Sequence, residues 1–231
     1  MDHEHALFTR VLEAHVSEGL VDYVGLANNK DFPAYIQSLE SVCAADYDTW
    51  SRDEKLAYWI NVYNAYTLRL ILDNYPLKSI RSIGFIPFSA FKKSFIPTTL
   101  EGEDGLISLS RVENKILRAK FNEPRIHFAI NCASASCPEL SNSAYRARDL
   151  SAQLERAARS FLADPARNRW SADTGTLYLS AIFKWFSGDF EGSAGSVQAY
   201  VERLWPAAWG DAPGKALNIE YLSYDWSLNG R

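Results

Sequence analysis

A single stretch, from Ser51 to Asn74, limits the folds open to this chain more than any other. It starts with Ser51-Arg52-Asp53-Glu54, a capping-box pattern in which the serine hydroxyl and the glutamate carboxylate satisfy backbone N–H groups left free in the first helical turn. It ends before Pro76, because proline disfavours helical geometry in the residue that precedes it. The stretch therefore predicts one long helix that is apolar on most faces and lies in the interior.

Two asparagines, Asn61 and Asn64, lie three residues apart within this predicted helix. A buried carboxamide has up to four hydrogen-bonding sites to satisfy, and asparagine is a poor helix former. Either these amides fasten a neighbouring irregular segment, or they orient a catalytic imidazole as the amide does in papain-like enzymes. Asn61 is thus a candidate catalytic residue and Asn64 a candidate binding residue.

The rest of the chain indicates a mixed fold. Apolar spacing and capping patterns predict helices over residues 6–18, 31–45, 110–120, 138–163 and 197–204. Strands are expected at 125–132, 176–180 and 218–226, and glycines and prolines predict a long irregular loop with short strands at about 76–107, of the kind that often borders a binding site. We predict an α+β protein, a single domain over residues 1–231, mainly helices packed around a small, mostly antiparallel sheet.

Composition excludes some partners. The formal charge of −4 and the pI near 5.6 argue against nucleic acid, because phosphate binding needs concentrated Lys and Arg. No stretch approaches the roughly 20 uninterrupted apolar residues of a transmembrane helix. The first five residues are acidic and polar, unlike a signal peptide. We expect a soluble protein, cytoplasmic as the sequence stands, or periplasmic or secreted if a leader has been removed.

The segment from Pro124 to Pro138 gathers the most reactive side chains. It contains His127 and two of the three cysteines, Cys132 and Cys137. A thiolate is the strongest nucleophile that a side chain offers, and an imidazole is its usual base. The same two cysteines also suit a disulfide that closes a small loop and stabilises the fold by about 2 kcal/mol. Both interpretations stay open, whereas a zinc site would need three or four ligands and we expect none.

Local geometry refines the thiol hypothesis. Proline favours the first helical position, so Cys137 is expected at a helix N-cap, where the helix dipole would lower its pKa. Backbone N–H groups of residues 133–137 could bind an oxyanion, and Asn131 and Ser134 are candidate binding residues beside Cys132. On a regular strand His127 and Cys132 point to opposite faces, so a direct pair requires a bulge or a twist at Asn131.

Four further side chains are candidates. Glu113 is either the third residue of a capping box with Ser110 or a general acid. Asp189 and Asp225 lie among aromatic residues and need a donor such as Arg118, Arg125 or Lys184. They are either ion-paired staples or include the acid of a triad. Trp185 is a candidate binding residue.

Other signatures of catalysis are missing from the sequence. It has no nucleophile elbow, no glycine-rich phosphate loop, no dinucleotide fingerprint and no paired-histidine metalloprotease motif. We therefore expect no cofactor. The third cysteine, Cys43, is expected as an inert core thiol at a helix face or end.

Several segments resemble, in the same order, motifs of a known family; they are residues 56–65, 75–80, 125–134, 136–138, 180–186 and 224–229. The chain is similar over roughly residues 6–229 to the family named domain of unknown function 547, DUF547. Its members are often bacterial and frequently carry a leader, so the resemblance implies a periplasmic or secreted protein. It implies no reaction. The family often has Glu-His where this chain has Glu113-Asn114.

Two hypotheses follow. In the first, the protein is a cofactor-independent thiol hydrolase or acyltransferase, distantly like the papain and transglutaminase group, that acts on an amide or ester of a small molecule or peptide. Cys132 or Cys137 attacks the acyl carbon and His127 shuttles the proton. That group usually places its cysteine before its histidine, whereas here His127 comes first. In the second, the protein is a non-catalytic binding domain with a Cys132–Cys137 disulfide and a groove lined by aromatic side chains, which make up 13% of the chain.

Overall fold

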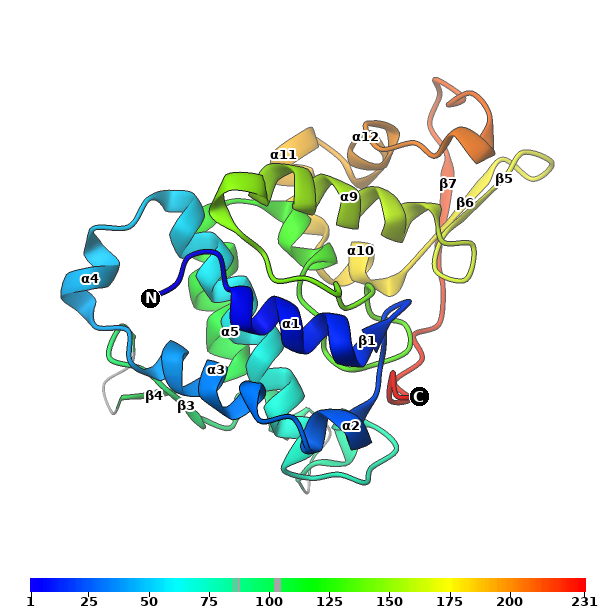
Figure 1. Ribbon diagram of the computed structural model, residues 1–231. Coiled ribbons are helices and arrows are strands. Elements are labelled where there is room, and N and C mark those ends of the chain that lie inside the picture. Colours follow the sequence, from blue (N-terminus) through cyan, green and yellow to red (C-terminus); the bar gives the residue numbers. More distant parts are fainter. Residues whose placement is uncertain (85, 87, 102–104) are drawn as a thin grey trace.

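The helix α5 (Arg52–Leu72) is the long helix that the sequence predicts, and Figure 1 shows it crossing behind the N-terminal helix. The capping box is present: the Ser51 hydroxyl accepts from the Glu54 N–H, and the Glu54 carboxylate accepts from the Ser51 N–H at 2.7 Å. Nearly every side chain from Leu56 to Ile71 is buried, so the predicted interior helix is confirmed. The computed structural model describes residues 1–84, 86, 88–101 and 105–231.

The N-terminal part wraps around α5. Its elements are α1 (Ala6–His15), β1 (Val16–Ser17), β2 (Leu20–Val21), α2 (Tyr23–Ala27), α3 (Asp31–Glu40) and α4 (Ala44–Asp48). Strands β1 and β2 form an antiparallel hairpin. The C-terminus returns to this hairpin: the Val21 N–H donates to the Asn229 carbonyl, and the Arg231 N–H donates to the Val21 carbonyl. Both ends of the chain therefore help to fix the same region.

The expected irregular segment from 76 to 107 contains short elements. They are the 3-10 helix η1 (Ile80–Ser82), helix α6 (Ser89–Lys92), and the antiparallel strands β3 (Ile96–Pro97) and β4 (Leu106–Ile107). Positions 85, 87 and 102–104 of this segment lie outside the described residues.

A continuous helix follows, with three parts: α7 (Leu109–Arg111), the π-helical turn η2 (Val112–Leu117) and α8 (Arg118–Phe121). The helix is where the sequence predicts it, but the expected capping box of Ser110 with Glu113 is wrong. Ser108 is the N-cap, and its hydroxyl accepts from the Arg111 N–H. Glu113 lies within the π turn, and such turns occur frequently at functional sites.

The segment after Asn122 differs from the sequence prediction. The expected strand over 125–132 is wrong, because Pro124 begins a 3-10 helix, η3 (Pro124–Phe128), whose N-cap Glu123 accepts from the Arg125 N–H. A short apolar run suits a buried helical turn as well as a strand. The expected helix start at Pro138 is also wrong: the chain is irregular up to the 3-10 helix η4 (Ala147–Asp149), and α9 (Leu150–Ala163) is the first α-helix after it.

The C-terminal part packs on the outer side of η3. Its elements are β5 (Arg169–Ser171), β6 (Thr176–Leu179), α10 (Ala181–Trp185), α11 (Ser187–Ala194), α12 (Val197–Glu202), η5 (Ala207–Trp209) and β7 (Asn218–Tyr221). Strands β5 and β6 are antiparallel, and β6 pairs with β7 in parallel. Helices together with small, mostly antiparallel sheets confirm the predicted α+β class.

Two apolar clusters make up the described core. One surrounds α5 and contains Ile126 and Ala129, and the other lies among α9 to α12 and contains Phe128. Because η3 contributes to both clusters, it lies at their junction and places His127 there. Among the described residues, no helix has the length and apolar character needed to span a membrane.

Candidate functional site

A cavity of about 250 Å³ lies at the junction of the two apolar clusters. Its wall brings together four of the predicted catalytic residues, Cys132, Cys137, His127 and Glu113, with the predicted binding residue Trp185. The other lining residues are Tyr63, Phe88, Phe91, Lys92, Ser110, Ile130, Pro138, Ile182, Phe186, Tyr224 and Trp226. Helices α5 and α10, the π turn, η3, the cysteine segment and the C-terminal segment therefore meet around one space.

The two thiols of the cavity are in contact. The sulfur atoms of Cys132 and Cys137 lie 2.7 Å apart, and both cysteines are free. Cys132 is partly exposed, whereas Cys137 is buried. The Cys132 sulfur also contacts the hydroxyls of Ser134 at 3.0 Å and Tyr224 at 3.4 Å, and the Cys132 N–H donates to the Cys137 sulfur at 3.0 Å. Several donors therefore surround this pair, of the kind that stabilise a thiolate.

The thiols titrate as one coupled pair. Burial alone raises the pKa of Cys137, but hydrogen bonds from the Cys132 thiol, the Tyr224 hydroxyl and the Cys132 N–H hold the pKa of Cys137 below its ordinary value. The contact with Cys137, together with burial, holds the pKa of Cys132 well above its ordinary value. The pair thus loses one proton readily, and the charge resides on Cys137 while Cys132 keeps its proton.

The expected cause of this acidity is wrong, because Cys137 is not a helix N-cap. The expected oxyanion site is also occupied. The N–H groups of Ala135 and Ser136 donate to the Ser227 and Asp225 carbonyls, that of Cys137 donates to the Ser134 carbonyl, and that of Ala133 donates to the Asn131 side chain. The Ala135 and Ser136 groups fix the cysteine loop to the C-terminal segment, and four of the five expected N–H donors are thus engaged within the protein.

Asparagine side chains hold this loop from the inside. Asn64 donates to the Ala129 carbonyl at 3.0 Å and accepts from the Asn131 N–H at 2.8 Å. Asn131 in turn donates to the Pro138 carbonyl at 2.7 Å. Asn61 likewise donates to the Tyr145 carbonyl and accepts from the Tyr145 N–H. Because these backbone groups bond to a side chain, they are not available for helical hydrogen bonds within residues 138–146. These asparagines do not line the cavity, so they support the site through the backbone.

We expect Asn64→Leu to lower the free energy of unfolding by about 2 kcal/mol, because the Ala129 carbonyl and the Asn131 N–H lose a buried partner. Asn74→Leu is the matched control, since Asn74 donates only to the Leu70 carbonyl near the end of α5. Asn74→Leu should change the free energy of unfolding by no more than about 0.5 kcal/mol. Urea unfolding measures both variants. Equal losses would mean that Asn64 does not fasten the loop.

His127 is oriented by an ion-pair network. Its Nε2 lies 2.7 Å from an oxygen of Asp189, and Arg118 donates to both oxygens of the same carboxylate at 2.6 and 2.9 Å. The imidazole also stacks on Phe186, with ring centres 4.0 Å apart. The predicted ion-pairing of Asp189 with Arg118 is therefore present, and Asp189 reaches the site through His127.

The network fixes the tautomer of His127. The hydrogen bonds from His127, with those from Arg118, hold the pKa of Asp189 well below its usual range, so the carboxylate accepts and Nε2 must carry a proton. Burial is the main cause that lowers the pKa of His127, although Asp189 acts against it. The imidazole is thus neutral at neutral pH, with its lone pair on Nδ1. No described residue forms a hydrogen bond with Nδ1, which leaves this nitrogen free to act as a base.

Glu113 is an unusual carboxyl group. It lies in the cavity wall, where the Tyr63 hydroxyl donates to it at 3.5 Å. Burial raises the pKa of Glu113 to about 7, while Arg118 lowers it and Cys137 raises it. A protonated, hydrogen-bond-donating Glu113 is therefore accessible near neutral pH.

Aromatic side chains form the mouth of the cavity. Trp226 packs against Trp185, Tyr224 and Phe88, with ring centres 5.8, 4.5 and 4.9 Å apart. Trp185 is 47% exposed, so this surface is open to solvent. A substrate with an apolar or aromatic group would find a matching surface here.

Other predicted residues lie elsewhere. Ser134 is buried beside Cys132 but does not line the cavity. Asp225 is exposed, and its carboxylate accepts from the Ser227 N–H two residues further along the chain. Cys43 is exposed before α4, so its expected core position is wrong: its neighbour Val42 fills the core instead. Sequence reasoning missed Tyr63 and Tyr224. Both carry a signal in hindsight, since Tyr63 lies between the two asparagines and Tyr224 begins the last motif.

The profile of the family described as protein of unknown function, DUF547, matches residues 47–162. The chain belongs to the DUF547 family. The matched span contains Glu113, His127, Cys132 and Cys137, whereas Trp185 and the other candidates of the C-terminal part lie beyond it. No curated protein and no solved structure matches the chain significantly.

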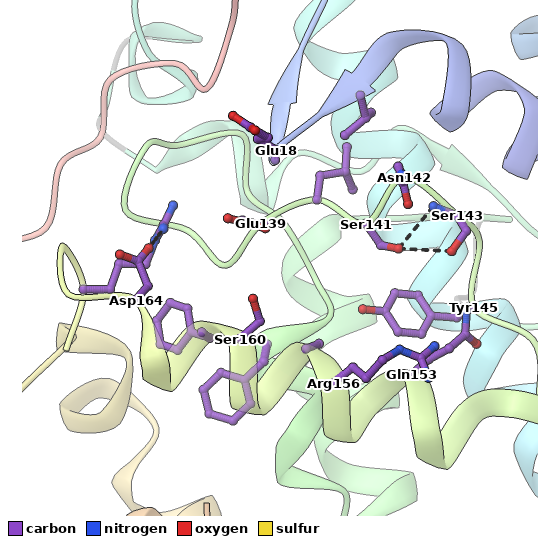
Figure 2. A pocket seen from close by; sticks show the side chains of 17 residues that line it. Glu18, Glu139, Ser141, Asn142, Ser143, Tyr145, Gln153, Arg156, Ser160 and Asp164 are labelled. Carbon is purple, nitrogen blue, oxygen red and sulfur yellow. Dashed lines mark hydrogen bonds and ion pairs between the residues drawn. The ribbon is translucent and has the colours of Figure 1, made fainter. Parts of the chain in front are cut away.

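A second cavity, of about 440 Å³, differs in chemistry. Figure 2 shows it between α9 and the segment from Glu139 to Tyr145, with the Tyr145 hydroxyl pointing into it. Its wall carries mainly polar and charged side chains and no cysteine or histidine. One of them, Arg167, donates to the Ala135 carbonyl at 2.9 Å and so supports the cysteine loop from behind. Within the described part of the chain, no three His, Cys, Asp or Glu side chains are placed to hold a metal ion.

Proposed function

We propose that this member of the DUF547 family is a cofactor-independent thiol hydrolase or acyltransferase that acts on an amide or ester of a small molecule or peptide. The observation that carries the proposal is one cavity whose wall holds a partly exposed cysteine, a second thiol 2.7 Å from the first, and a histidine oriented by a carboxylate. A nucleophile, a base and an orienting group are the parts that thiol catalysis requires.

Cys132 is the nucleophile in this proposal, because it is the more exposed residue of the two. Cys137 acts as its base: a proton shift across the 2.7 Å contact moves the negative charge to Cys132. The Cys132 sulfur then bonds to the acyl carbon, and the carbonyl electron pair moves to the oxygen. This assigns different roles to two cysteines that the sequence leaves equivalent.

The leaving group needs a proton when the tetrahedral intermediate collapses. Among the described residues, His127 is not hydrogen-bonded to either thiol, so we place it on the leaving-group side of the substrate. The proton that Cys137 has taken from Cys132 is relayed to Nδ1 of His127 by the substrate or by water. The protonated imidazole would donate to the departing nitrogen or oxygen. The acyl group then passes from Cys132 to water or to another acceptor, with neutral His127 as the base.

The developing oxyanion also needs donors. Because four of the five loop N–H groups already have partners, we assign this role to hydroxyl and carboxyl donors of the cavity wall, Tyr63, Tyr224 and protonated Glu113. The aromatic mouth favours an apolar acyl or leaving group. Glu113 thus keeps a catalytic role in the proposal, whereas Asn61 acts as a positioning residue.

A screen of chromogenic esters and amides with apolar acyl groups tests this function. We expect turnover by the natural protein, and a loss of about a thousandfold in Cys132→Ser and in His127→Ala. Cys43→Ser is the matched control and should retain full activity, since Cys43 lies outside the cavity. Iodoacetamide labelling across pH 5 to 9 should modify Cys132 below the ordinary thiol range, and Tyr224→Phe should shift this labelling to higher pH.

Two outcomes would contradict the proposal. One is turnover that survives in both Cys132→Ser and Cys137→Ser. The other is a cavity whose thiols stay unreactive to iodoacetamide over the whole pH range while the protein remains folded. The first result would mean that turnover uses groups other than the two thiols. The second would favour a binding domain that uses the aromatic mouth to hold a ligand.

A further inference from the structure

We propose that Cys132 and Cys137 also form a reversible dithiol–disulfide pair that undergoes exchange with aliphatic disulfides. This activity goes beyond acyl transfer, because it uses the two sulfurs and needs neither His127 nor an oxyanion site. The reactants are the reduced protein and a disulfide of the form RSSR, which supplies the oxidising equivalents.

The first argument is the distance between the two sulfur atoms. They lie 2.7 Å apart, inside van der Waals contact, and a disulfide bond is about 2.05 Å long. Bond formation therefore requires only a small movement of side chains.

The second argument is that the backbone holds the thiols together. Ala135 and Ser136 donate to carbonyls of the C-terminal segment, Asn229 donates to the Ala133 carbonyl, and Arg167 donates to the Ala135 carbonyl. A loop fixed at so many points keeps one thiol beside the other in both redox states. Such fixation gives the second thiol a high effective concentration toward a mixed disulfide on the first.

The third argument separates a reactive pair from a purely structural disulfide. Cys132 is partly exposed in the cavity wall, so a reagent can reach it. The Tyr224 hydroxyl and the Cys132 N–H lie at the sulfurs as hydrogen-bond donors, and the Ser134 hydroxyl, which donates to Tyr224, contacts the Cys132 sulfur. A permanent disulfide has no charge to stabilise, whereas a thiolate that attacks or leaves does.

The exchange balances in two steps. The Cys132 thiolate attacks one sulfur of RSSR, which forms a Cys132–S–S–R mixed disulfide and releases RS⁻. The Cys137 thiolate then attacks the Cys132 sulfur, which forms the Cys132–Cys137 bond and releases a second RS⁻. Two electrons pass from the protein to the disulfide, and the two thiol protons end on the released thiols.

Oxidised and reduced glutathione in varied ratios provide the test, with Cys43→Ser as the background so that no exposed thiol links two chains. After acid quenching and alkylation, intact mass and peptide mapping should show loss of two hydrogens at Cys132 and Cys137, reversed as reduced glutathione increases. Cys137→Ser should accumulate glutathione on Cys132, and Cys132→Ser should react about tenfold more slowly, because the remaining thiol is buried.

His127→Ala keeps this test separate from the proposed acyl transfer. We expect the variant to lose ester and amide turnover and to retain exchange at the natural rate. A pair that stays reduced at every glutathione ratio would overturn the inference. So would a disulfide that excess reduced glutathione cannot open unless the protein is unfolded, since that bond would be structural only.

Discussion

Asp189→Asn is expected to lower the free energy of unfolding by about 3 kcal/mol at neutral pH and to lower turnover by at least about a hundredfold. The carboxylate accepts from His127 and from two nitrogens of Arg118. An asparagine has the same shape but presents its amide donor to one of these donors, and it carries no charge to balance the guanidinium. Urea unfolding and the ester assay measure the two losses.

The pH dependence distinguishes lost charge from lost packing. His127 and Arg118 hold the pKa of Asp189 below its ordinary value of 3.8, so its contribution to stability is complete above that pH and declines as the pH falls below it. The difference between the natural protein and Asp189→Asn should therefore narrow in acid. The variant should also lower the pKa of His127, because Asp189 raises it, and NMR titration of the imidazole would show this. A difference in stability that stays constant with pH would mean that the carboxylate contributes by packing alone.

The sequence predicts best those features whose causes are local. The helix from Ser51 is recognisable because its capping box and apolar residues are contiguous, and the structure places its start where expected. That Asp189 pairs with an arginine follows from the need of a carboxylate among aromatic rings for a donor, although the sequence left Arg118, Arg125 and Lys184 open as that donor. The gathering of Cys132, Cys137 and His127 in one cavity follows from their closeness along the chain.

Features that depend on distant partners were not predictable in the same way. The backbone after Pro138 looks helical in sequence, but Asn61 and Asn131 take its hydrogen-bonding groups and hold it in an irregular path. The C-terminal segment accepts from the N–H groups of Ala135 and Ser136, which the sequence had left available for an oxyanion. Tyr63 and Tyr224 both line the cavity, although they lie far apart in the sequence, in α5 and in the C-terminal segment.

Glu113→Gln should remove a pH dependence of stability that the natural protein shows. Burial raises the pKa of Glu113 from 4.5 to about 7, so between these values the folded protein binds a proton that the unfolded chain has lost. Stability from this group is therefore complete below pH 4.5 and is lost as the pH rises through 7, by about 3 kcal/mol in total. The glutamine side chain is a neutral donor at every pH, so the variant should not lose this stability. Between pH 4 and pH 8 the free energy of unfolding of Glu113→Gln should therefore rise by about 3 kcal/mol relative to that of the natural protein.

Glu123→Gln is a control of opposite sign. Burial acts on Glu123 too, but Arg125 outweighs it and lowers the pKa of Glu123 below 4.5, so its stabilisation is present above that pH and is lost in acid. Its glutamine variant should be the less stable protein at pH 8 and should approach the natural protein at low pH. Urea unfolding from pH 4 to 8 measures both variants. If Glu113→Gln followed the course of Glu123→Gln, Glu113 would be ionised in the folded protein and could not donate a hydrogen bond to a substrate oxygen at neutral pH.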